Sequence, residues 1–326
     1  MSGHYACKMR RAAEAVSSEV RRAAQILRAG GLVGFPTETV YGLGADASSE
    51  KAVVRLYAAK GRPADHPVII HFASAEQAFA WAREIPHGAR ELAQRFWPGP
   101  LTLILKRSTL AKDFVTGGQD TVGLRVPSHP VARQLLKEFA GAIAAPSANR
   151  FGKVSPTTAA HVRQDLGKDV ELVLEGGPSE VGIESTIVDL SGAAAVLLRP
   201  GSISKETLEA VIGSLAEKAA TSPRHSGGLE RHYAPRTPAR MVPAHALDKE
   251  ISKGKSVAVL AFSRPDERVD FWLRMPREPQ AYARRLYAAL RELDSVGCEQ
   301  ILVEAPPGGD EWDAVRDRLK RACEQA

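Results

Sequence analysis

Short apolar runs alternate with amphipathic stretches along most of the chain. The runs are bounded by Gly, Pro, Asn or Asp, which is typical of strands, and predict strands over 32–35, 67–72, 101–105, 121–126, 142–145, 171–174, 185–190 and 196–198. Helical spacing between them predicts helices over 50–60, 75–83, 88–96, 130–139 and 157–166, after a first helix over 18–29. Because some strands follow one another without a helix, the pattern favours a twisted mixed sheet flanked by helices, an α/β fold.

The pattern changes over residues 217–238, which are rich in Pro, Gly and basic residues and show no apolar periodicity. A stretch of this kind predicts a linker, and long loops are often functional. Beyond it, strands over 256–262 and 300–305 and helices over 281–293 and 312–322 predict a small Rossmann-like α/β domain. The expected organisation is therefore a catalytic domain, a linker and a C-terminal domain, at 1–217, 218–238 and 239–326.

Composition narrows the class of protein without deciding its function. The chain has 326 residues and a net charge of +6, which suits a polyanionic partner such as a nucleic acid or a nucleoside triphosphate but also an ordinary basic surface. No apolar run approaches the roughly 18 residues of a membrane span, and no apolar segment of a secretory signal follows Met1–Arg11. Cys7, Cys298 and Cys323 are too few and too scattered for a disulfide framework or a zinc site, so we expect free thiols and a cytoplasmic location.

The sequence argues against two common phosphate-binding motifs. Gly42–Ala47 fits G-x-G-x-x-A before a predicted helix, but Pro36–Thr39 separates it from the preceding strand, which disfavours a dinucleotide site. No G-x-x-x-x-G-K-[ST] occurs, which excludes a P-loop.

Several isolated polar residues are ambiguous when each is considered alone. Lys60 continues the apolar stripe of helix 50–60, so it either extends past that stripe to solvent or, with Arg62, binds phosphate oxygens. His71 and Arg125 lie inside predicted strands, where a guanidinium could hold a carboxylate through two hydrogen bonds. Pro146–Asn149 follows a strand, where open α/β sheets place ligands, or is a simple Ser/Asn turn.

Taken together and in order, these segments are characteristic. The chain contains Pro36–Leu43, Lys60–Pro63, His66-Pro67, His71, Trp97–Thr102, Gly123–Pro127, Pro146–Asn149 and Glu184–Thr186. Over residues 15–210 the set resembles the YrdC-like family, in the long two-domain form of L-threonylcarbamoyladenylate synthase. Gly228–Pro235 is similar to the interdomain segment of that family.

The resemblance implies an enzyme, a nucleotidyltransferase. It implies that L-threonine, bicarbonate or CO2, and ATP with Mg²⁺ are converted to threonylcarbamoyl-AMP and pyrophosphate, for threonylcarbamoyladenosine modification of tRNA. The resemblance further implies weak tRNA binding and contact with the downstream tRNA threonylcarbamoyl transferase complex. It implies neither a membrane nor a metal ion held by the protein. The alternative from charge alone is a non-catalytic basic RNA-binding module, although no RNA-binding motif with a stacking platform is present.

Site residues follow from the same resemblance. Lys60 and Arg62 are the implied catalytic pair. The implied threonine pocket consists of Thr39, His71, Arg125, the backbone at Ala145, and Ser185. The implied ATP site consists of Arg62, His66, Thr121, Ser147, Asn149, Ser155 and Arg199, with Tyr233 of the linker closing over it. His66 departs from the family, which often has Asn before this Pro.

Overall fold

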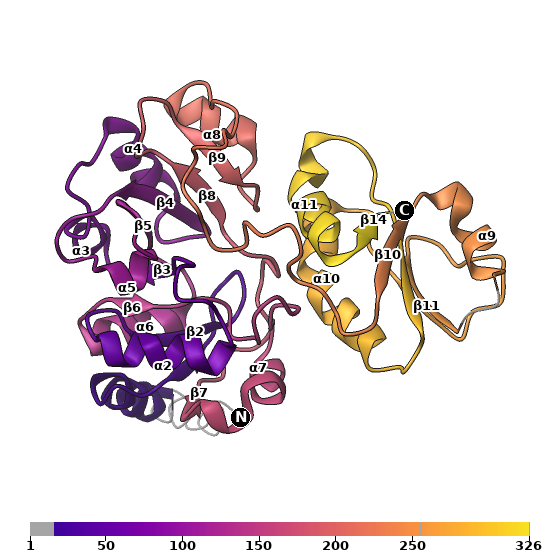
Figure 1. Ribbon diagram of the computed structural model, residues 1–326, viewed down its shortest axis with the longest axis horizontal. Coiled ribbons are helices and arrows are strands. Elements are labelled where there is room, and N and C mark those ends of the chain that lie inside the picture. Colours follow the sequence, from indigo (N-terminus) through magenta and orange to yellow (C-terminus); the bar gives the residue numbers. More distant parts are fainter. Residues whose placement is uncertain (1–15, 254–255, 326) are drawn as a thin grey trace, which may run out of the picture.

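The computed structural model describes residues 16–253 and 256–325, and within them the chain forms two α/β units joined by a long connection (Figure 1). The first unit has a nine-stranded sheet in the order β7-β1-β2-β6-β3-β5-β4-β8-β9. The second has a five-stranded sheet in the order β12-β11-β13-β10-β14. None of the helices in these residues is long and apolar enough to cross a membrane.

The first sheet is mixed, as predicted. Parallel pairs join β1 to β7, β3 to β5 and β4 to β8, and the other neighbours run antiparallel. The strands are β1 (Val33–Phe35), β2 (Gly42–Asp46), β3 (Ile69–His71), β4 (Leu101–Lys106), β5 (Thr121–Arg125), β6 (Ile143–Ala144), β7 (Leu172–Val173), β8 (Thr186–Asp189) and β9 (Val196–Arg199).

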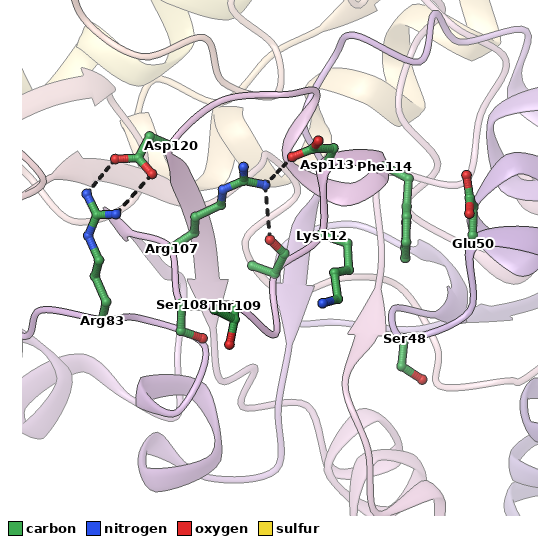
Figure 2. Close-up of a pocket in the computed structure, with 11 residues that line it drawn as sticks. Ser48, Glu50, Arg83, Arg107, Ser108, Thr109, Lys112, Asp113, Phe114 and Asp120 are labelled. Atoms are coloured by element: carbon green, nitrogen blue, oxygen red, sulfur yellow. Dashed lines mark hydrogen bonds and ion pairs between the residues drawn. The ribbon is translucent and has the colours of Figure 1, made fainter.

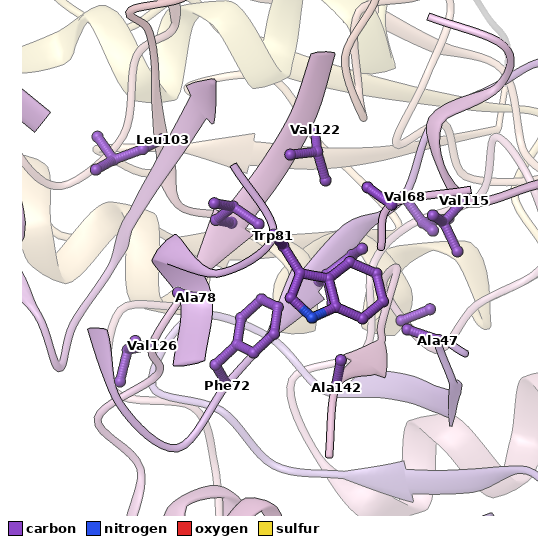
Figure 3. Close-up of a cluster of buried hydrophobic side chains, with 14 of the residues drawn as sticks. Ala47, Val68, Phe72, Ala78, Trp81, Leu103, Val115, Val122, Val126 and Ala142 are labelled. Atoms are coloured by element: carbon purple, nitrogen blue, oxygen red, sulfur yellow. The ribbon is translucent and has the colours of Figure 1, made fainter. Parts of the chain in front are cut away.

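Helices cover the sheet close to their predicted positions. Residues 16–28 are helical, and the others are α2 (Glu50–Lys60), α3 (Ala75–Phe79), α4 (His87–Phe96), α5 (Asp113–Thr116), α6 (Pro130–Phe139), α7 (Ala159–Leu166) and α8 (Lys205–Ile212). Of these, α5 and α8 were not predicted. Helix α2 begins at the Ser49 cap and ends where Gly61 adopts the left-handed conformation, with φ 64°. The hydrophobic core packs Trp81 against Phe72, whose ring centroids lie 5.7 Å apart (Figure 3).

One segment differs from the prediction. No strand was predicted over Gly42–Asp46, which fits the glycine pattern of a dinucleotide turn that we disfavoured, yet this segment is strand β2 and pairs antiparallel with β1. Glycine is disfavoured in strands, but here Phe35 occupies the space that side chains would fill. A Cβ at Gly44 would lie 3.0 Å from the Phe35 ring, and one at Gly42 would lie 3.2 Å from it. The dinucleotide turn is therefore absent from this segment.

The second unit has a fully parallel sheet, as predicted for a Rossmann-like domain. Its elements are β10 (Ala239–Val242), α9 (Leu247–Ile251), β11 (Val257–Ala261), β12 (Phe271–Arg274), α10 (Pro279–Asp294), β13 (Gln300–Glu304), α11 (Asp313–Ala322) and β14 (Glu324–Gln325). Of these, β10, β12, α9 and β14 were not predicted. Cys298 and Cys323 are free thiols, as expected, whereas Cys7 and the N-terminal segment lie outside the described residues.

Candidate active site

The predicted threonine and nucleotide residues converge on one small cavity of about 40 Å³ between the first sheet and the linker. Nine of them line it: Thr39, Arg62, His71, Arg125, Ala145, Ser147, Ser185, Arg199 and Tyr233. Ligand pockets usually measure about 300–1,000 Å³. The structure therefore shows this site in a closed form.

The two polar residues predicted inside strands lie side by side. His71 ends β3 and Arg125 ends β5, and the parallel register of these strands pairs them directly. The guanidinium of Arg125 is anchored from behind, because Nη2 donates to Glu38 Oε1 at 2.7 Å and to Thr39 Oγ1 at 2.9 Å. Burial alone would raise the pKa of Glu38, but the charge of Arg125 and its hydrogen bond outweigh burial. The pKa of Glu38 is therefore lowered. Arg125 is thus held as a cation at the cavity wall.

His71 adds an uncharged polar group beside this cation. Burial, reinforced by the charge of Arg125, lowers the pKa of His71 well below its usual 6.5. Its Nδ1 is buried and has no hydrogen-bond partner in the described residues. A neutral imidazole with an unsatisfied nitrogen is ready to bond a polar group of a ligand.

Ser185 and Arg199 form another part of the cavity wall. Arg199, the last residue of β9, donates from Nε to the Ser185 carbonyl at 3.0 Å and from Nη2 to Ser185 Oγ at 3.1 Å. The same hydroxyl lies 2.8 Å from Thr102 Oγ1. Ser185 therefore has a fixed orientation before any substrate enters.

Arg62 and Arg199 both contact the linker. The turn after α2 places Arg62, since its backbone N–H bonds the Tyr57 carbonyl. Arg62 Nη2 donates to Ser226 Oγ at 3.4 Å, and Arg199 Nη1 donates to the Ser226 carbonyl at 2.8 Å. Burial lowers the pKa of Arg62 to about 10, which leaves it protonated at neutral pH. One linker residue thus occupies donors of two cations.

Lys60 is buried, which excludes the alternative that it extends to solvent, but it does not line the cavity. Its ammonium donates to the carbonyls of Ser147 and Asn149. Burial, with the nearby Arg62, lowers the pKa of Lys60 well below 10.5. In this closed form Lys60 fixes the loop after β6, and its catalytic role stays a prediction.

Four other predicted nucleotide residues surround the cavity without lining it. Thr121 begins β5, at the end away from Arg125, and Asn149 donates from Nδ2 to the Lys153 carbonyl at 2.8 Å. His66 packs edge-on against Phe151, with ring centroids 5.4 Å apart. Ser155 is fully buried and donates to Glu184 Oε1 at 2.5 Å. Their contacts with ATP remain predictions.

The linker reaches the cavity through Gly227, His232 and Tyr233. Tyr233 has φ 61°, unusual for a residue with a side chain, and its buried hydroxyl has no partner in the described residues. A Cβ at Gly227 would lie 2.1 Å from that hydroxyl. Only glycine fits there, so the linker is shaped to lie against Tyr233.

Sequence reasoning assigned no role to Glu38 or Glu184. Glu184 lines the cavity, and burial would raise its pKa, but Arg318 and Arg199 outweigh burial and lower that pKa to about 2. Each glutamate directly precedes a predicted pocket residue, Thr39 or Ser185. The signal in the sequence that could have identified both glutamates is an acidic residue directly before a predicted ligand-binding residue.

A broader hollow of about 1,050 Å³ lies elsewhere on the first unit (Figure 2). Its charges are mostly satisfied among themselves, as Figure 2 shows. Arg83 pairs with Asp120 at 2.6 Å and Arg107 with Asp113 at 2.5 Å. None of the predicted site residues lines it, so the smaller cavity is the better candidate despite its size.

Residues 16–253 and 256–325 contain no group of three or more His, Cys, Asp or Glu that could hold a metal ion. The cavity cations suit an anionic ligand instead.

Comparison with known proteins identifies the family of the chain. A Sua5/YciO/YrdC family model, described as telomere recombination, matches residues 25–201, and one described as threonylcarbamoyl-AMP synthase, C-terminal domain, matches residues 203–323. The threonylcarbamoyl-AMP synthase of Pyrococcus abyssi is 43% identical over 93% of this chain and 94% of its own length. That of Bacillus subtilis is 39% identical over 94% and 93%.

The structural comparison extends over both units. The crystal structure of Pyrococcus abyssi Sua5 complexed with L-threonine has a TM-score of 0.88 and 40% identity, covering 95% of this chain and 96% of that one. The resemblance given by the motifs is thereby confirmed. The chain belongs to the threonylcarbamoyl-AMP synthase family, in the form that carries a second, C-terminal domain.

Proposed function

We propose that the cavity is where this enzyme joins L-threonine, bicarbonate or CO2, and ATP into threonylcarbamoyl-AMP, with release of pyrophosphate. The observation that carries the proposal is that Arg125, Arg199 and Arg62 line one cavity together with Thr39 and Ser185. A carboxylate, an amino-acid hydroxyl and a triphosphate are the groups such a lining recognises.

Threonine fits the end of the cavity formed by β3 and β5. Arg125 Nη2 bonds Glu38 and Thr39, and its Nε donates to the Gly99 carbonyl at 3.4 Å, so Nη1 is the nitrogen left to bind the substrate carboxylate. His71, the Ala145 backbone and Ser185 lie around the same space and supply short polar contacts. Neutral His71 adds no repulsion to an amine that must lose its proton to react.

ATP fits between Arg62, Arg199 and Ser147, with Mg²⁺ carried on its phosphates. Lys60 and Asn149 support this part through the loop after β6. Lys60, buried here, would neutralise phosphate charge once that loop moves. His66, Thr121 and Ser155 complete the proposed nucleotide contacts from the surrounding shell.

The chemistry needs no covalent protein nucleophile. The neutral amine of threonine adds to the carbon of CO2, forms an N–C bond and releases a proton, which gives a carbamate. A carbamate oxygen then attacks the α-phosphorus in line, and the bond from that phosphorus to the bridging oxygen breaks as pyrophosphate leaves. The protein positions the reactants and balances charge.

Closure of the linker protects these reactants from water. We propose that residues 218–238, between units at 1–217 and 239–326, act as the lid, with Tyr233 over the nucleotide. The buried position of Tyr233 and the contacts of Ser226 with two arginines support this. We further propose a cytoplasmic location, weak tRNA binding and delivery of the product to the tRNA threonylcarbamoyl transferase complex.

The test mixes purified protein with ATP, Mg²⁺, threonine and bicarbonate and follows pyrophosphate, with mass-spectrometric detection of threonylcarbamoyl-AMP. Release should require both threonine and bicarbonate. Arg125→Ala and Lys60→Ala should abolish it while leaving the circular dichroism spectrum unchanged. Full activity in both variants would remove the assigned site, and salt-dependent RNA binding without turnover would favour the RNA-binding alternative.

A further inference from the structure

We propose that Arg318 and Tyr287, both from the second domain, are positioning residues for the threonine pocket of the first. They hold Glu184 and thereby fix Ser185, which directly follows it. The inference rests on the proposed function, because it concerns how that same pocket is kept ready for substrate. It gives the C-terminal domain a defined part in the reaction.

Glu184 is the point at which the two domains share buried charge. Tyr287 on α10 donates its hydroxyl to Glu184 Oε2 at 2.9 Å. Arg318 on α11 donates from Nε to the same oxygen at 2.9 Å and from Nη2 to the Glu184 carbonyl at 3.2 Å. One guanidinium therefore holds both the side chain and the backbone of a cavity residue.

From Glu184 the restraint passes directly to the proposed substrate contacts. The next residue, Ser185, accepts two hydrogen bonds from Arg199. The 184–185 segment is thus held by Arg318 from the second domain and by Arg199 from the first. Its position is set only when both domains are in place.

The same two side chains also contact the linker. The Arg318 guanidinium carbon lies 5.5 Å from the centroid of the Tyr233 ring, within cation–π range. The Tyr287 and Tyr233 ring centroids lie 5.7 Å apart. Arg318 and Tyr287 therefore support the pocket wall and the residue proposed to cover it.

Docking of the domains alone would not require this arrangement. A buried ion pair adds little stability compared with apolar packing, and Val40 and Ile183 of the first unit already pack into the apolar core of the second. A separate interdomain contact also joins the domains, because Arg284 Nε on α10 donates to the Glu180 carbonyl at 2.5 Å. What distinguishes Arg318 is its partner, a residue of the cavity.

The chain offers a matched pair of variants on one helix. Tyr287→Phe removes the hydroxyl that bonds Glu184, whereas Tyr282→Phe removes a buried hydroxyl on α10 that has no partner in the described residues. Titration calorimetry with threonine, and KM for threonine in the pyrophosphate assay, should show about tenfold weaker binding for Tyr287→Phe, the size of one lost hydrogen bond to a charged group. For Tyr282→Phe, the affinity for threonine and the KM for threonine should both stay within about twofold of wild type.

A second pair separates positioning from docking. Arg318→Lys keeps the charge but loses the fork that bonds side chain and backbone, so the KM for threonine should rise. Arg284→Lys alters the other interdomain contact and should leave that KM near the wild-type value. Equal effects in the two lysine variants would mean that docking alone matters, and this would overturn the inference.

If Arg318→Lys does not fold, the comparison of Tyr287→Phe with Tyr282→Phe still tests the positioning role. Unchanged threonine affinity in Tyr287→Phe, or equal losses in both tyrosine variants, overturns the positioning role. Wild-type protein that binds no threonine contradicts the proposed function itself. Binding to wild type with a selective loss in Tyr287→Phe supports both.

Discussion

Neutralising Glu184 should destabilise the protein by an amount that depends on pH. Arg318 and Arg199 outweigh burial and lower the pKa of Glu184 from 4.5 to about 2 in the folded protein. At 1.36 kcal/mol per pKa unit, the charged form contributes about 3 kcal/mol to folding at pH 7. Because the folded pKa is the lower one, this stability is present above about pH 4.5 and is lost as pH falls towards about 2.

The perturbation is Glu184→Gln, which keeps the size of the side chain and removes its charge. The free energy of unfolding, measured by urea titration, should fall by about 3 kcal/mol at pH 7. At pH 3 the wild type has itself lost part of the contribution, so the difference should shrink to less than half of its value at pH 7.

A matched control is Glu180→Gln, since Glu180 is an exposed carboxylate close by in the sequence. Exposed substitutions usually change stability by no more than about 0.5 kcal/mol. The stability difference between Glu180→Gln and wild type should therefore be small at pH 7 and should not shrink further at pH 3. If Glu184→Gln and wild type differ equally at both pH values, the charge of Glu184 is not what stabilises the fold. Equal stability at pH 7 refutes the reasoning outright.

Two further predictions concern the pocket and the linker. Glu38→Gln leaves Arg125 without its buried counter-ion, so the KM for threonine should rise about tenfold or more, as expected for one lost charged contact, while kinetics at saturating threonine show whether kcat is spared. Gly227→Ala places a Cβ against the Tyr233 hydroxyl at φ 80°, so the linker should fail to close. Amide hydrogen exchange should then rise across 224–233 and kcat should fall; unchanged exchange would argue against the close fit.

The strands that carry the site were predictable because their chemistry is local. His71 and Arg125 interrupt apolar runs, and those runs become the neighbouring parallel strands β3 and β5. Strand β2 was not predictable in this way, since Gly42 and Gly44 carry no strand propensity. Their place depends on Phe35, which reaches them only once β1 and β2 pair.

Long-range partners limit prediction of the site in the same manner. Glu184 was visible as part of a motif, but Arg318 lies 134 residues further along the chain and Tyr287 lies 103 residues further. No spacing rule connects them. Lys60 shows a further limit, because the helical stripe left open whether its side chain extends to solvent, and gave no sign of the carbonyls of Ser147 and Asn149 that it bonds.

The contacts of the linker bear on the order of events during turnover. In the closed form Ser226 takes hydrogen bonds from Arg62 and Arg199, two cations proposed to hold the triphosphate. A phosphate oxygen bonds a guanidinium more strongly than a neutral hydroxyl or carbonyl does. ATP should therefore displace Ser226 as it binds, and pyrophosphate release should return the donors to the linker. The cavity of about 40 Å³ is too small for the nucleotide, so we expect this displacement to enlarge it as ATP enters.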